Sequence, residues 1–201
     1  NSQTSVISAG DYFIHDIVKK METDLGLDIG YNGEDIVFKN LTINGTAGFS
    51  LLGNHIDAET GDDNLGCSVS ISSDGSIIAF GAYGNNNIPG TARVYQRNAN
   101  NTTVAPIGWS QLGGDIDGEV NGDRSGYSIS LSSDGSIVAV GTPYHPNTRK
   151  GTARVYERDI TNTTVAPIGW SQLGGDLDGI SNWEYAGYSI SLSSDGSIVA
   201  V

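Results

Sequence analysis

The feature that most constrains this chain is a fifteen-residue stretch that occurs twice without change. Residues 126–140 and 187–201 both read GYSISLSSDGSIVAV. Aligning the chain with itself extends the match to a period of about sixty residues, with copies that begin near positions 49, 109 and 170. Tandem repetition of this kind is typical of stacked units that bury their apolar faces against one another.

Each copy carries the pattern of short strands joined by tight turns. Tyr127, Ile129 and Leu131 alternate with serines, which predicts a strand with one buried face. The SSDGS segment 132–136 is typical of a tight turn, and the apolar run 137–140 is typical of a strand covered on both sides.

The rest of the repeat predicts two further strands. Residues 152–157 (TARVYE) alternate again, and residues 170–177 follow as a fourth strand. Four short antiparallel strands in a repeat of about sixty residues are typical of a propeller blade. We therefore predict a mainly β, β-propeller-like chain of tandem four-stranded antiparallel blades.

Two pairs of large side chains recur at fixed places in the repeat. Trp109 and Trp170 are equivalent, and so are Arg93 and Arg154. Because repetition within a chain marks what every unit needs for folding, we expect the tryptophans to be core wedges, with stacking on sugar rings as the alternative. We expect the arginines to be structural ion-pair or stacking residues and not ligand contacts.

Domain boundaries follow from the repeat. We assign residues 49–201 to the repeats, as 49–108, 109–169 and an incomplete 170–201, and residues 1–48 to a separate N-terminal segment. That segment predicts a short amphipathic helix followed by a β-hairpin with Asn-Gly turns. The helix is expected to pack on the rest of the chain or, alternatively, to dock into a neighbouring subunit. Its apolar stripe consists of Phe13, Ile14, Ile17, Val18, Met21 and Leu25.

Composition excludes several classes of function. The net charge of -13, from 23 acidic and 10 basic residues, repels phosphate and anionic lipid, so we expect no nucleic-acid partner. No segment is apolar over the length needed to span a bilayer, so we expect no membrane insertion. The three histidines stand at unrelated places in the repeat, and Cys67 has no neighbouring histidine. We therefore expect no enzymatic activity.

Three sequence patterns carry a resemblance to a known family. They are Gly-x-Ser-x-Ser at 126–130, the strand that ends at Val140 and Gly141, and Gly-Thr-Ala-Arg-Val-Tyr at 151–156. Together they resemble FG-GAP repeats, the blades of the integrin α-type β-propeller. The resemblance covers residues 49–201 and implies a binding or scaffold role, since such repeats are similar to those of surface adhesins and of virus or phage structural proteins.

Calcium is an open alternative. In the family the first hairpin of the blade commonly holds calcium, whereas here it is the short SSDGS with Asp134 alone, so that calcium loop is not expected. A different run places oxygens at every second position, as a hard cation favours. Its counterparts in the other copies do not keep the pattern, so we favour a solvated acidic loop and no cofactor, with Ca2+ as the alternative. The run consists of Asp115, Asp117, Glu119, Asn121 and Asp123.

The loops that differ between copies are the candidates for partner contact. If the strands run up and down, the loops between strands two and three and those between blades emerge on one face, and these are the loops that vary. Aromatic and arginine side chains supply most of the energy of interfaces. Drift in unconstrained surface loops is the alternative explanation. The candidate contact residues are Arg124, Tyr144, His145, Arg149, Trp183 and Tyr185.

These observations predict a non-enzymatic structural and recognition component of an exposed assembly such as a virion, phage tail or fibre. Its N-terminal segment would anchor it to protein subunits, and its repeats would present the variable loops to a host receptor or surface glycan, outside the cell or on a virion surface. The alternative is a secreted or cell-surface adhesin that binds glycan or protein, with or without calcium. We also expect the natural chain to continue or several copies to assemble, because two complete repeats do not close a propeller.

Overall fold

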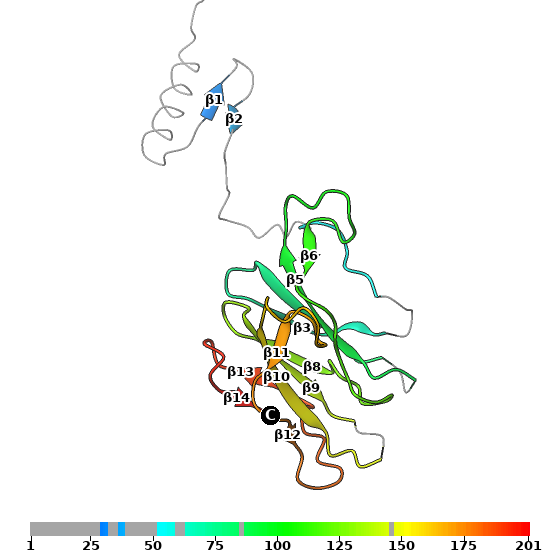
Figure 1. The fold of residues 1–201 in the computed structure, drawn as a ribbon. Coiled ribbons are helices and arrows are strands. Elements are labelled where there is room, and N and C mark those ends of the chain that lie inside the picture. Colours follow the sequence, from blue (N-terminus) through cyan, green and yellow to red (C-terminus); the bar gives the residue numbers. More distant parts are fainter. Residues whose placement is uncertain (1–28, 32–35, 39–51, 59–62, 85–86, 145–146) are drawn as a thin grey trace, which may run out of the picture. The chain divides into compact units, whose positions relative to one another are not determined.

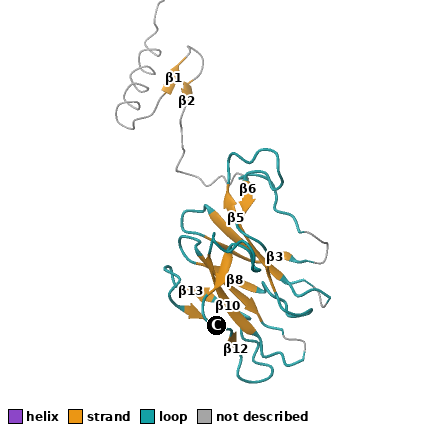
Figure 2. Cartoon of the chain, in the orientation of Figure 1, coloured by secondary structure: helices purple, strands orange, loops and turns teal. Residues whose placement is uncertain are grey.

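A computed structural model describes residues 29–31, 36–38, 52–58, 63–84, 87–144 and 147–201. The chain divides into two compact units, Asn1–Ser50 and Leu51–Val201. In the first unit, β1 (Ile29–Tyr31) pairs antiparallel with β2 (Ile36–Phe38). The predicted helix and its apolar stripe, Phe13 to Leu25, lie outside the described residues. The described residues contain strands and turns and no helix (Figures 1 and 2).

The second unit begins with a complete antiparallel sheet, the first sheet. Its order is β3-β4-β5-β6, and the short β7 pairs with the other end of β5. The serine-alternating segment forms β3, the apolar run forms β4, and the TARVY segment forms β5. The strands are β3 (Leu65–Ile71), β4 (Ile77–Ala82), β5 (Thr91–Arg97), β6 (Trp109–Gln111) and β7 (Ile116–Asp117).

The next copy builds the second sheet with the same order, β8-β9-β10-β11, and β12 pairs with β10. A final hairpin, β13-β14, starts a third sheet. The prediction of a mainly β chain with antiparallel sheets is therefore confirmed in the described residues. The strands are β8 (Ser128–Leu131), β9 (Ile137–Thr142), β10 (Thr152–Arg158), β11 (Trp170–Gln172), β12 (Leu177–Asp178), β13 (Ser191–Leu192) and β14 (Val199–Ala200).

The fourth strand of each sheet is broken, which corrects the single strand predicted at 170–177. Tyr156 pairs with Gln172 and Ala153 pairs with Leu177, so residues 173–176 lie opposite only Arg154 and Val155. The bulge is built on two glycines, of which Gly174 has φ 72°. Asp176 is the last residue of the bulge, and its carboxylate lies on Arg154.

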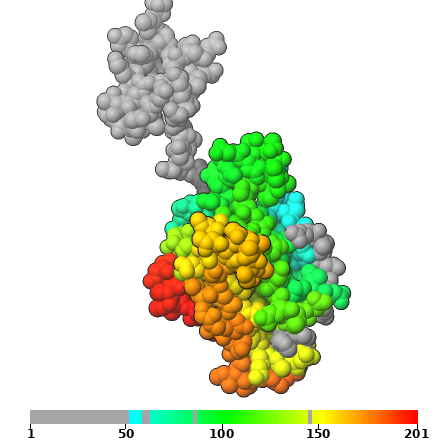
Figure 3. Space-filling view, in the orientation of Figure 1, coloured from blue at the N-terminus to red at the C-terminus, as the bar shows by residue number. Residues whose placement is uncertain are grey.

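Successive sheets stack through their first strands. β8 contacts both β3 and β13 (Figure 1). The Leu131 backbone N–H donates to Ser70 Oγ at 2.9 Å, and the Leu192 N–H donates to Ser130 Oγ at 3.0 Å. The small serine side chains therefore replace part of the backbone pairing between neighbouring sheets. Figure 3 shows the green and the yellow-to-orange segments packed against each other.

Glycine at the end of the second strand permits this close stacking. A Cβ on Gly81 would overlap the carbonyl oxygen of Gly126, and a Cβ on Gly141 would overlap that of Gly187. The glycine that follows Val140 in the sequence pattern is thus explained by the approach of the next sheet.

The core lies between the first and second sheets. Ala79, Val94 and Ile116 of the first sheet pack with Leu131 and Val140 of the second. Trp109 and Trp170 are 5% and 1% exposed, and each indole N–H donates to a backbone carbonyl more than fifty residues earlier, that of Leu52 at 3.0 Å and Leu112 at 2.9 Å. The prediction that these tryptophans are core wedges is confirmed.

Candidate recognition surface

The variable loops meet at one end of the stacked sheets. The loop 118–125 lies along the preceding sheet's loop, since the Ser125 N–H donates to the Pro89 carbonyl at 2.9 Å. The loop 179–186 repeats this contact with residues 147–151, where the Ala186 N–H donates to the Lys150 carbonyl at 2.8 Å. Tyr144 N–H also donates to the Asp123 carbonyl at 3.1 Å. Residues from successive copies are thus held side by side.

At this end, side chains from three copies form a continuous aromatic–arginine cluster. Tyr127 is central, with ring centroids 5.5 Å from Tyr83, 6.0 Å from Tyr144 and 4.8 Å from Tyr188. Tyr144 extends the contacts to Tyr185 at 5.2 Å. All four centroid distances lie in the range of favourable aromatic pairs, about 4.5–7 Å. The aromatic–arginine cluster consists of Tyr83, Arg124, Tyr127, Tyr144, Arg149, Trp183, Tyr185 and Tyr188.

Two arginines cover the rings. The Arg124 guanidinium carbon is 4.1 Å from the Tyr144 ring centroid, and that of Arg149 is 5.0 Å from the Trp183 centroid. Both are cation–π distances, which order the guanidinium groups while leaving their N–H donors for a ligand. Arg124 Nε is buried and has no hydrogen-bond partner among the described residues.

The backbone at these side chains adopts the left-handed conformation. Arg124, Arg149, Trp183 and Tyr185 have φ values of 59°, 51°, 70° and 55°. Each such non-glycine residue costs about 1 kcal/mol. Asn64, at the place of Arg124 in the first copy, has φ 54°. The conformation is therefore a property of the repeat, while the side chain that it carries changes from copy to copy.

The cluster is accessible, and the hydroxyl group of its central residue, Tyr127, keeps its proton. Trp183 is 64% exposed and Tyr188 is 54% exposed. A hydrogen bond with Tyr188 raises the pKa of Tyr127 to about 12. The surface therefore offers ring faces for stacking, phenol groups for hydrogen bonding and guanidinium donors, which together suit the binding of a sugar ring or of a protein side chain.

Five of the six residues predicted for partner contact are brought together in this cluster, namely Arg124, Tyr144, Arg149, Trp183 and Tyr185. The sixth, His145, lies outside the described residues.

Three further members were not predicted: Tyr83, Tyr127 and Tyr188. Tyr127 was assigned to the buried face of a strand, but it precedes β8 and is only half-buried. The repetition of tyrosine at 83 and 144 and at 127 and 188 is the signal that could have found them.

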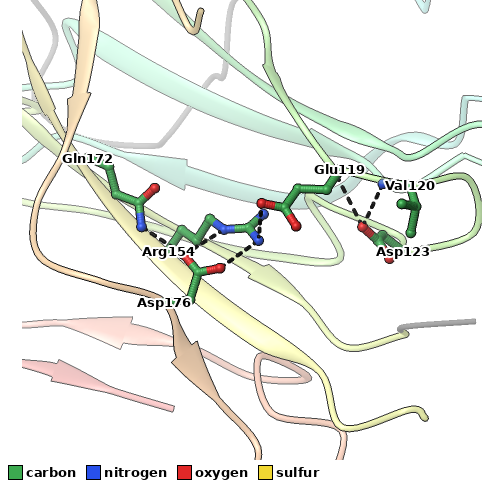
Figure 4. A network of polar contacts seen from close by, with 6 residues as sticks. All are labelled: Glu119, Val120, Asp123, Arg154, Gln172 and Asp176. Carbon is green, nitrogen blue, oxygen red and sulfur yellow. Dashed lines mark hydrogen bonds and ion pairs between the residues drawn. The ribbon is translucent and has the colours of Figure 1, made fainter. Parts of the chain in front are cut away.

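The acidic run is divided between two sheets. Asp115 pairs with Arg93 at 2.9 Å, and Glu119 pairs with Arg154 at 2.9 Å. Asp123 turns back to accept the Glu119 and Val120 N–H groups (Figure 4). In the described parts of the chain, no three acidic, histidine or cysteine side chains are grouped to hold a metal ion. Asp117 and Asn121 belong to neither of these two ion pairs, and calcium stays an alternative prediction.

The structural role predicted for the two arginines is confirmed. Arg154 Nε and Nη2 donate to the two carboxylate oxygens of Asp176 at 2.9 and 2.7 Å, and Arg93 Nε donates to Asp115. The hydrogen bond from Arg154 holds the pKa of Asp176 below its usual value. These arginines fix the bulged fourth strand to the third strand in each sheet.

Comparison with known proteins finds no family model and no curated protein that matches the chain. The resemblance to FG-GAP repeats therefore rests on the residues quoted above. Over the ranges that the structure describes, no helix has the length and apolar character needed to cross a membrane.

Proposed function

We propose that this chain is a β-propeller-type repeat protein that serves as a non-enzymatic structural and recognition component of an exposed assembly, such as a virion, phage tail or fibre. The aromatic–arginine cluster is the recognition surface. The observation that carries the proposal is that one repeated backbone conformation presents different side chains, Asn64, Arg124 and Tyr185, at the same place in successive copies. A fixed frame with variable side chains is the usual arrangement of binding loops on a rigid scaffold.

The propeller assignment is supported by the sheet order and by the stacking. Each complete sheet has a path of four antiparallel strands in sequence order, with a short fifth strand paired with the third, and neighbouring sheets approach through their first strands. A propeller arranges four to eight four-stranded antiparallel sheets around a central channel. The resemblance of the repeats to FG-GAP blades supports the same assignment and a place among surface adhesins or virion proteins.

The chemistry of the cluster favours a surface glycan or a receptor protein as partner. Exposed Trp183 provides a ring face, and Arg149 lies 5.0 Å from its centroid. Aromatic and arginine residues in this arrangement are typical centres of binding energy. The N-terminal segment, with the stripe Phe13 to Leu25, is proposed to anchor the chain to protein subunits of the assembly.

The recognition surface is tested by binding of the full chain to an array of glycans and to host-cell surfaces. Trp183→Ala is expected to weaken binding about tenfold or more while leaving the melting temperature nearly unchanged, because Trp183 is 64% exposed. The matched control is Val165→Ala, a 67% exposed residue in the repeated NTTVAPIG segment. Equal effects of the two variants, or no effect of either, would contradict the proposal.

Two experiments separate the assembly from the adhesin alternative. Deleting residues 1–30 should abolish incorporation into a particle while the repeats keep their β circular dichroism spectrum; unchanged incorporation would contradict the anchor. If the chain is instead a calcium-assisted adhesin, its melting temperature should rise when calcium is added and fall when a chelator is added. A melting temperature unaffected by both counts against it.

A further inference from the structure

The two arginines of the aromatic–arginine cluster differ from those inside the sheets. Arg93 and Arg154 each pair with an aspartate of the bulged fourth strand. Arg124 and Arg149 instead lie over aromatic rings, and neither guanidinium has an ion-pair partner among the described residues. An unpaired guanidinium keeps its N–H donors for an anionic group from outside the chain.

The acidic side chains next to the cluster are turned to the backbone. Asp123, which precedes Arg124 in the chain, accepts two backbone N–H groups of its own loop at 3.1 and 3.0 Å (Figure 4). Glu184, which follows Trp183, accepts the Ile180 N–H. These hydrogen bonds hold the two loops in shape, and they keep both carboxylates from neutralising the arginines of the cluster.

Arg149 and Trp183 form the accessible part of the cluster. The Trp183 N–H donates to the Thr148 carbonyl at 3.2 Å, which holds the two loops together. The exposed Arg149 side chain places its guanidinium carbon 5.0 Å from the Trp183 ring centroid, and Trp183 is still 64% exposed. The guanidinium carbons of Arg149 and Arg124 both lie within 5.8 Å of the Tyr144 ring centroid. One ligand can therefore meet an indole face and a pair of guanidinium groups.

The preceding junction between loops lacks these groups and provides an internal reference. Ile88 takes the place of Arg149, and Gly122 takes the place of Trp183, as counted from the glycines that follow each loop. The backbone contact is nevertheless kept, since the Gly122 N–H donates to the Ile88 carbonyl at 3.1 Å. The repeat fold therefore requires neither the arginine nor the tryptophan.

These groups select the class of ligand. A guanidinium binds a carboxylate through two parallel hydrogen bonds, and an exposed indole offers a flat apolar face that suits the C–H face of a sugar ring. We propose that the cluster binds an acidic sugar, with the ring stacked on Trp183 and the carboxylate accepting from Arg149 beside Arg124. This inference rests on the proposed function, because it names the ligand class of the same surface.

The test is an NMR titration of the full chain at neutral pH and constant ionic strength. The probes are the methyl glycosides of glucuronic, galacturonic and N-acetylneuraminic acid. Each acid is compared with its own methyl ester, which has the same ring without the charge. At least one acid should cause saturable shifts at the Trp183 indole N–H and at the amide of residue 149, and should bind about tenfold more tightly than its ester.

Matched variants assign the carboxylate to the arginine. Arg149→Gln keeps a long polar side chain and should lower the affinity for the acid about tenfold, so that acid and ester bind alike. Trp183→Ala should weaken both. Arg97→Gln removes the same charge at an exposed position, at the end of β5 away from the loops, and should change neither affinity. Thermal melting identifies a variant that has failed to fold, and Arg124→Gln then takes the place of Arg149→Gln.

The outcomes separate this inference from the proposed function. Equal binding of each acid and its ester would overturn the role of the carboxylate and leave the recognition surface in place. Equal effects of Arg149→Gln and Arg97→Gln would mean that affinity follows net charge, which also overturns the inference.

Two further outcomes concern the sugar. Tighter binding of an Nα-acetylated aspartate amide than of any acidic sugar would assign the surface to an acidic peptide and overturn the choice of a sugar. The absence of saturable shifts with every acid would overturn the inference as a whole, whereas the proposed function is decided separately by the glycan array and the host-cell surfaces.

Discussion

The first and second sheets have nearly the same sequence but bury it differently. Ile129 and Leu131 of β8 are each 8% exposed, whereas their counterparts in β3, Val69 and Ile71, are 55% and 58% exposed. The first sheet lies against the apolar face of β8, and no described residues cover the same face of β3 to this extent. Burial in this fold is therefore supplied by the neighbouring sheet and not by the strand itself.

Burial at the opposite end of the stack also depends on a neighbouring sheet. Ile116 of the first sheet is 1% exposed, and Leu177, its counterpart in the second sheet, is 39% exposed. A complete sheet packs on Ile116, whereas only a hairpin follows Leu177. Each sheet thus gains stability from both neighbours, and the contacts between sheets are the natural place to test this comparison.

The largest effect is expected from truncating the buried member of an equivalent pair. Leu131→Ala should lower the free energy of unfolding by about 2–4 kcal/mol, because it leaves a cavity between the sheets. Ile71→Ala, at 58% exposure, should cost less than about 1 kcal/mol. Urea denaturation followed by circular dichroism measures both. Similar losses would mean that the face of β3 is covered in solution.

The next effect concerns the close approach of the sheets. Gly81→Ala should cost about 1–3 kcal/mol, because its Cβ would overlap the Gly126 carbonyl oxygen and push the second sheet away. Gly175→Ala is the control, since no atom lies within 4 Å of its added Cβ. Thermal unfolding compares the two variants. If Gly81→Ala leaves the thermal stability unchanged, the two sheets approach each other less closely in solution than in the structure.

A smaller effect is expected from the serine bridges. Ser70→Ala removes the acceptor of the Leu131 N–H and should cost about 1 kcal/mol. Ser191, which takes the corresponding place in the last hairpin, is exposed, and Ser191→Ala should be close to neutral. Amide hydrogen exchange at Leu131 provides the site-specific measurement, with faster exchange expected only in Ser70→Ala.

The smallest effect on stability is expected from the aspartate of the SSDGS turn, and it should be the same in both sheets. Hydrogen bonds from Ser76 and Ser72 lower the pKa of Asp74 from 3.8 to about 2, and those from Ser132 and Ser136 lower the pKa of Asp134. Because the folded pKa is depressed, this stabilisation is present above about pH 4 and is lost as the pH falls towards 2.

Asp74→Asn and Asp134→Asn should therefore each flatten the dependence of stability on pH over that range. Urea denaturation between pH 5 and 2 tests this. Because both aspartates accept from the two flanking serines, a clear difference between the variants would show that neighbouring sheets also act on the turns.

The sequence predicted most of the local structure because each element depends on residues close in the chain. The serine alternation, the SSDGS turn and the TARVY strand lie where the pattern placed them. The fourth strand was predicted without its break, because two glycines opposite a paired strand leave no periodic signal. The bulge accompanies the pairing of Arg154 with Asp176, a contact between different strands that a local pattern does not show.

The sequence predicted part of the candidate site, again because part of it depends only on local residues. The choice of variable aromatic and arginine residues led to Arg124, Tyr144, Arg149, Trp183 and Tyr185. Tyr127 was misassigned, because alternation alone does not tell a residue just before a strand from one within it. The buried Nε of Arg124, which has no hydrogen-bond partner among the described residues, could not be predicted, because this depends on which acceptors of neighbouring elements reach it.

By itself, the sequence determined the repeat, its mainly β strands and turns, and the places where copies differ, because these are set by local patterns of polarity and glycine. Only the tertiary structure decided which identical faces are buried, which loops meet and which polar atoms lack a partner. Those properties depend on contacts between copies about sixty residues apart. A repeated pattern does not indicate which of its copies is covered by a neighbouring one.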